Sequence, residues 1–177
     1  MKFQISKFYV CVFALVMSAV VTINAQETQM DVLMNQSLSR LQQPSPQNFL
    51  NSIAELKRID AMFPDSIKPK YQIVLQSLNF AVMNPQAEQT EILIKEAEQT
   101  IEKMKEMSNA DYSDISTLTG YLYMTRIVQN PAVNGQRYYI LVMQNYEKAL
   151  KLNPDNKLAK ELQKKFLEGM KQATSQL

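Results

Sequence analysis

The sequence predicts an all-α fold of about seven helices that pack as consecutive antiparallel pairs. After residue 25, apolar residues recur at spacings of three and four, which places them on one face of a helix. Strand-type alternation is weak, and proline and asparagine interrupt the helical pattern at intervals. The connections between the helical stretches are short, which favours antiparallel packing of neighbours.

The first three helices are separated by breaks that contain proline. The first spans about 28–42 and ends at Pro44-Ser45-Pro46, and Ser45 or Asn48 caps the second. The second ends at Phe63-Pro64-Asp65, and the third, about 66–83, stops near Asn84-Pro85. Their apolar faces hold Met30, Leu33, Met34, Leu38 and Leu41, then Phe49, Ile53, Leu56 and Ile59, then Tyr71, Val74, Leu75, Leu78 and Val82.

The fourth helix, about 86–107, shows the clearest amphipathic pattern. Its apolar residues are spaced by three, four and three, and its glutamates lie mostly elsewhere around the helix. Asp111, Ser113 or Asp114 caps the fifth helix, which Asn130-Pro131 closes. The two apolar faces hold Ile94, Ala97, Ile101 and Met104, then Ile115, Leu118, Leu122 and Ile127.

A loop with Asn134-Gly135 is expected after the fifth helix, because both residues favour turns. The sixth helix then spans about 136–152, and Asn153-Pro154-Asp155 forms a sharp turn before the last helix. Apolar residues mark both helices: Tyr139, Val142, Tyr146, Ala149 and Leu150, then Leu158, Leu162, Phe166 and Met170.

Residues 1–25 are typical of a cleaved secretory signal peptide. Lys2 and Lys7 precede an apolar run, 8–23, and Ala25 supplies the small residue before a cut ahead of Gln26. An uncleaved anchor is the alternative, but its span is short against the ~20 residues of a membrane helix, and no second hydrophobic run follows. No cysteine follows the cut, so we expect a periplasmic or secreted protein that is not a lipoprotein, with residues 26–177 as a single domain.

The composition excludes several classes of chemistry. The chain has no histidine, its one cysteine lies in the signal segment, and its three glycines are scattered. Histidine or cysteine zinc sites, Ser-His-Asp and Cys-His nucleophiles and phosphate-binding glycine loops are therefore not expected, and neither is a cofactor. Cleavage leaves a net charge of zero, which gives no electrostatic reason to bind nucleic acid.

The stretch from Tyr146 to Asn156 resembles the second helix and closing turn of a tetratricopeptide repeat. An aromatic residue is followed by Ala149 and then by Pro154, at the spacing with which the repeat ends. Upstream, Gly120 and Tyr123 fit the first helix of such a repeat, and the extra residues 130–138 form an insertion.

Four further pieces extend the resemblance to exported tetratricopeptide-repeat-like (TPR-like) proteins of Gram-negative bacteria: Phe63-Pro64, Glu96-Ala97-Glu98 with Ile101, Arg126-Ile127 with Asn130-Pro131, and Asn153-Pro154-Asp155-Asn156. The resemblance implies helix pairs stacked as a short right-handed superhelix with a concave groove. In the register set by Gly120, four residues would face that groove, namely Thr117, Tyr121, Met124 and Thr125, and Arg126 and Arg137 would flank it. Half-buried packing is the alternative for any single tyrosine.

Two charged features have a structural and a functional interpretation. Asp111 and Asp114 have the chemistry of an acid/base pair, but helix capping explains them more simply. The lysine-rich segment 148–171 is suited to an anionic lipid surface or, more simply, to a solvated helix that caps the array.

We therefore expect a non-catalytic exported protein that binds a protein or peptide partner, with self-association as a further possibility. A helical bundle that binds a small molecule or lipid is the alternative, and it needs an enclosed apolar pocket. An enzyme that uses carboxylates or tyrosine is the third class, and the sequence shows no cluster with catalytic spacing.

Overall fold

A computed structural model describes residues 28–174 of the chain, and side chains up to residue 172. Within this range the protein is all-helical, with seven α-helices and one short 3₁₀ helix, as the sequence predicts. The first helix occupies residues 28–39. It is followed by η1 (Arg40–Gln42), α2 (Pro46–Met62), α3 (Ile67–Met83), α4 (Glu88–Lys105), α5 (Tyr112–Gln129), α6 (Pro131–Leu152) and α7 (Lys157–Thr174). The predicted signal peptide lies outside the described residues.

Side-chain caps explain where several helices begin. Ser45 Oγ accepts a hydrogen bond from the Asn48 amide at 3.1 Å and starts α2, with Pro46 at its first position. Asp111 Oδ1 accepts from the amides of Ser113 and Asp114 at 2.8 and 3.1 Å and starts α5. Of the candidate caps that the sequence offered, Ser45 and Asp111 are therefore the ones used.

The predicted loop around Asn134-Gly135 is wrong. α6 begins at Pro131, so Asn130 alone separates it from α5. Asn130 Oδ1 caps the new helix by accepting from the Val133 amide at 3.3 Å. Asn134 Nδ2 donates to the Arg126 carbonyl at 2.7 Å, which ties the first turn of α6 to the last turn of α5. The inserted residues therefore lengthen α6.

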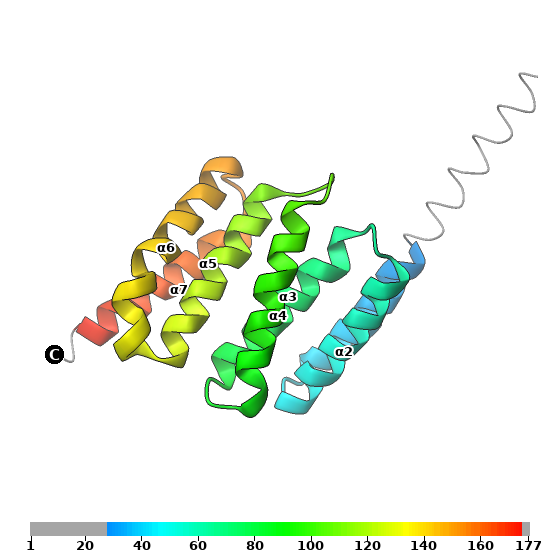
Figure 1. Cartoon of the computed structure of the whole chain (residues 1–177), viewed down its shortest axis with the longest axis horizontal. Coiled ribbons are helices and arrows are strands. Elements are labelled where there is room, and N and C mark those ends of the chain that lie inside the picture. The colour runs from blue at the N-terminus through cyan, green and yellow to red at the C-terminus, as the bar shows by residue number, and fades with distance from the viewer. Residues whose placement is uncertain (1–27, 175–177) are drawn as a thin grey trace, which may run out of the picture.

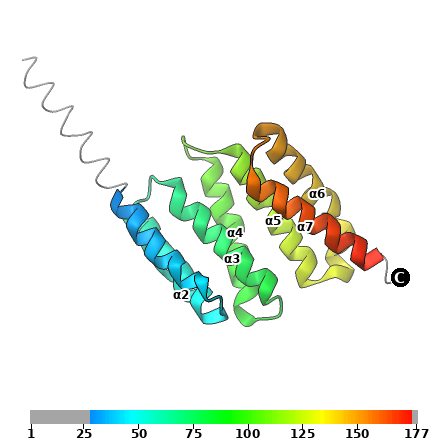
Figure 2. The same cartoon turned by 180° about the vertical axis from the view of Figure 1, so that it is seen from behind.

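The helices alternate between two layers. Figure 1 shows α2, α4 and α6 in front, and the view from behind in Figure 2 shows the 28–39 helix, α3 and α7 on the opposite side. α5 contacts α3, α4, α6 and α7, so it lies at the centre of the C-terminal part of the array. Each successive helix packs on its predecessor, and the array grows in one direction from the 28–39 helix to α7.

The main core is built from residues of the five helices from α3 to α7. Within it, Leu118, Ile94 and Tyr146 are fully buried. Two smaller clusters join the 28–39 helix to α2 and α3, and α2 to α3 and α4. No described helix has the combination of length and apolar character that a membrane span requires.

One buried cation stabilises the turn from α2 to α3. The Lys70 ammonium donates to Asp60 Oδ1 and to the Pro64 carbonyl, both at 2.7 Å. Lys70 is only 9% exposed, so its partners replace the water that it loses on folding. This contact holds the first turn of α3 in place, and that turn lines the site described next.

Candidate partner-binding groove

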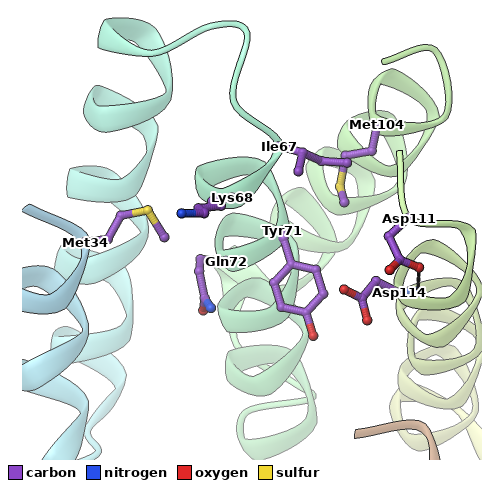
Figure 3. Close-up of a pocket in the computed structure, with 8 residues that line it drawn as sticks. All are labelled: Met34, Ile67, Lys68, Tyr71, Gln72, Met104, Asp111 and Asp114. Atoms are coloured by element: carbon purple, nitrogen blue, oxygen red, sulfur yellow. Dashed lines mark hydrogen bonds between the residues drawn. The ribbon is translucent and has the colours of Figure 1, made fainter. Parts of the chain in front are cut away.

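A groove of about 260 Å³ lies where the 28–39 helix, α3, the end of α4 and the start of α5 meet. We call it the acidic groove, and it is lined by Met34, Ile67, Lys68, Tyr71, Gln72, Met104, Asp111 and Asp114 (Figure 3). Four of these residues come from α3, where spacings of one, three and four place them on neighbouring positions of one helical face. The capping residue Asp111 and the first-turn residue Asp114 bring the start of α5 to the same place.

The two ends of the acidic groove differ in charge. Figure 3 shows the Tyr71 ring between them, with its hydroxyl close to the carboxylate of Asp114. Lys68 points the other way, toward Met34, and forms a salt bridge with Asp31 at 3.3 Å. Asp111 and Asp114 form no salt bridge within residues 28–172. The groove therefore has a charge-compensated end and an end with two uncompensated carboxylates.

Burial and neighbouring charges shift the pKa values of two groove residues, Asp114 and Tyr71. Burial and the Asp111 charge raise the pKa of Asp114, although a hydrogen bond from Asn156 acts in the opposite direction. Burial, together with Asp114 and Asp111, raises the pKa of Tyr71 to about 12. Tyr71 therefore keeps its proton at neutral pH, so its hydroxyl can donate a hydrogen bond to a bound partner, and a role as a catalytic base is not favoured.

Thr117, Tyr121 and Thr125 are buried and do not face an open groove, contrary to the expectation from the sequence. They are 0%, 5% and 1% exposed. Tyr121 Oη donates to Asn79 Oδ1 of α3 at 2.8 Å, and Thr117 Oγ1 accepts from Asn156 Nδ2, just before α7, at 3.2 Å. Because α3 and α7 flank α5, they cover this face of the helix.

The other three predicted contact residues lie apart from one another. Met124 is half-buried, and its sulfur accepts from Tyr146 Oη at 3.8 Å. Arg126 Nη1 binds Glu91 Oε2 of α4 at 2.6 Å. Arg137 is exposed on α6 and lies 5.0 Å above the ring of Tyr138. These side chains reach toward different helices, so the six predicted residues do not form one surface.

Sequence reasoning missed the acidic groove although it noticed most of its parts. Tyr71 was assigned to an apolar face, and Asp111 and Asp114 to a helix cap, and Asp111 does cap α5. The proximity of two aspartates within four residues was the available signal. It did not indicate which elements would lie opposite them, because the lining comes from four separate helices.

Within the described residues, no group of three or more acidic side chains is arranged to hold a metal ion. Over residues 28–174 the fold is an all-α array of seven helices in two layers, and residues of four of these helices line the acidic groove. No family model, curated protein or solved structure matches this chain.

Proposed function

We propose that this is a non-catalytic, exported, TPR-like protein that holds a segment of another protein in the acidic groove. One observation carries the proposal: an open groove combines apolar side chains with a hydroxyl donor and two uncompensated carboxylates. Protein recognition sites typically combine apolar anchors with a few polar groups that fix orientation. The alternation of helices between two layers supports the TPR-like arrangement, and the predicted signal peptide supports export.

A small-molecule or lipid-binding bundle is less favoured as the alternative. The groove holds about 260 Å³ and opens to solvent, whereas pockets for drug-sized ligands hold about 300–1,000 Å³ and enclose most of the ligand. An extended chain that passes over the groove needs only one or two side chains to enter it. The size of the groove therefore fits an anchor side chain better than a whole ligand.

Photo-crosslinking in the native cell tests the proposal. A photoreactive phenylalanine derivative replaces Gln72 in the groove, and the control places it at Gln144, which is exposed on α6. We expect the Gln72 position to form a discrete crosslink to another protein that the Gln144 position does not form. Equal crosslinking from both positions, or none from either, would contradict a partner-binding groove.

A further inference from the structure

The two carboxylates of the acidic groove have a different charge environment from five carboxylates on the neighbouring helices. Asp65, Glu88 and Glu106, which are exposed, also lack a salt bridge within the described residues, but five carboxylates in this part of the fold are matched by cations from other elements. The matched pairs are Asp31 with Lys68, Glu55 with Arg40, Asp60 with Lys70, Glu91 with Arg126 and Glu96 with Lys57. Asp111 and Asp114 have no such cation within the described residues, although Asp114 is half-buried.

Each of these carboxylates keeps one acceptor oxygen available. Asp111 Oδ1 accepts from two backbone amides, and Asp114 Oδ1 accepts from Asn156 Nδ2 at 3.1 Å. The Oδ2 atom of each residue accepts no hydrogen bond within residues 28–172. The amides at the start of α5 stabilise negative charge there and hold the Asp111 carboxylate, whereas the Asn156 side chain holds the Asp114 carboxylate.

The rest of the lining suits an aliphatic stem that leads to a charged head. The Tyr71 ring lies beside the Asp114 carboxylate, and the apolar side chains of Ile67 and Met104 line the groove above them (Figure 3). The methylene groups of lysine and arginine pack well on such a surface, and a cation near a tyrosine ring gains an additional attraction. A cation here would also relieve the repulsion between the two aspartates.

We propose that the acidic groove receives a lysine or arginine side chain of a partner polypeptide, with its charged head at Asp111 and Asp114 and its stem against Tyr71. This inference rests on the proposed function and specifies the chemistry of the partner. The two carboxylates favour a basic side chain by charge complementarity. The apolar lining favours a partner segment in which apolar residues flank that lysine or arginine.

The test uses random 12-residue peptides displayed on phage and selected on the full chain. The matched variants neutralise carboxylates: Asp111→Asn with Asp114→Asn in the groove, and Asp155→Asn at an exposed position before α7. Asparagine caps helices as well as aspartate does, so the groove variant should fold, and circular dichroism melting checks this. The readout is the affinity of the selected peptides at low and high salt.

We expect selected peptides to carry a lysine or arginine beside apolar residues. They should lose affinity about tenfold or more on the groove variant and keep it on Asp155→Asn, and high salt should weaken them. Peptides without basic enrichment, or with equal affinity for both variants, would overturn the inference.

Two further outcomes assign the site to another occupant and so overturn the proposal. Spermidine that competes with the peptides and binds as tightly would indicate a free amine. A salt-sensitive dimer that the groove variant abolishes would indicate the lysine-rich α7 of a second copy. A crosslink at Gln72 that persists while the peptide selection fails would leave partner binding intact and refute only the basic side chain.

Discussion

Gly120 of α5 lies directly against the ring of Tyr146 of α6. A Cβ atom added to Gly120 would be 2.8 Å from Tyr146 Cε1 and 3.3 Å from the Asn145 Cβ. Tyr146 is fully buried, so its ring has little room to move. The absent side chain of Gly120 therefore makes the space that this aromatic ring occupies, and the pair sets how closely α5 and α6 pack.

Gly120→Ala should destabilise the protein by about 1–3 kcal/mol, because the added methyl group forces the buried ring or the α6 backbone to shift. This cost exceeds the roughly 0.5–1 kcal/mol that alanine normally gains over glycine within a helix. Urea denaturation monitored by circular dichroism measures the difference in the free energy of unfolding.

Gly135→Ala is the matched control, because Gly135 also lies within a helix and a Cβ built there has no atom within 4 Å apart from its chain neighbours and the nearby backbone of the same helix. We expect it to stabilise the protein by roughly 0.5–1 kcal/mol. If both substitutions stabilise the protein equally, close packing between α5 and α6 does not require Gly120.

Asn156→Ala should destabilise the protein by about 2–4 kcal/mol. The Asn156 amide group donates to Ser113 Oγ and Thr117 Oγ1, and its oxygen accepts from the Ala159 amide at 3.0 Å, so one side chain caps α7 and joins it to α5. The midpoint of thermal unfolding reports the loss.

Asn153→Ala is the control, because it removes only an exposed hydrogen bond from the Asp155 amide, and it should have a smaller effect. Similar losses of stability in both variants would contradict the role of Asn156 in joining α7 to α5.

Arg126→Ala should lower the stability by about 1 kcal/mol at neutral pH and by less in acid. Burial alone would raise the pKa of Glu91, but hydrogen bonds from Arg126 and Gln129 and the Arg126 charge lower it overall. The ion pair therefore stabilises the fold above the ordinary pKa of a glutamate, and this stabilisation is lost as the pH falls through the lowered value.

Denaturation curves at pH 7 and in acid measure this dependence, with Lys95→Ala as the control. Lys95 lies 3.8 Å from the same carboxylate but is largely exposed, so a smaller change is expected. A loss that is independent of pH would show that Arg126 acts through packing and not through Glu91.

Asp114→Asn should change the pH dependence of stability in the opposite sense. Because the pKa of Asp114 is raised in the folded protein, ionising this residue costs more there than in the unfolded chain. The wild-type protein should therefore lose stability as the pH rises through that pKa, and the variant should not. Parallel denaturant titrations of both proteins across this range check the prediction, and identical slopes would contradict it.

The positions of the helices were largely predictable from local sequence. Ser45 and Asp111 accept hydrogen bonds from amides two or three residues away, so the caps need no distant partner. The start of α6 was the exception, since Asn134 and Gly135 favour a turn by themselves. The hydrogen bond from Asn134 to the Arg126 carbonyl exists only once α6 packs beside α5.

Sequence alone therefore determined the helical class, most of the breaks between helices and most of each buried stripe, because these depend on spacing and on contacts within a few residues. Tyr139 is an exception, since it was predicted on the apolar face of the sixth helix but is 37% exposed. The tertiary structure decided which further faces are covered. The repeat register set by Gly120 placed Tyr121 on a groove face of the fifth helix, but α3 and α7 flank α5 and bury it. The acidic groove was decided in the same way, since Tyr71 and Asp114 are far apart in sequence and meet only through packing.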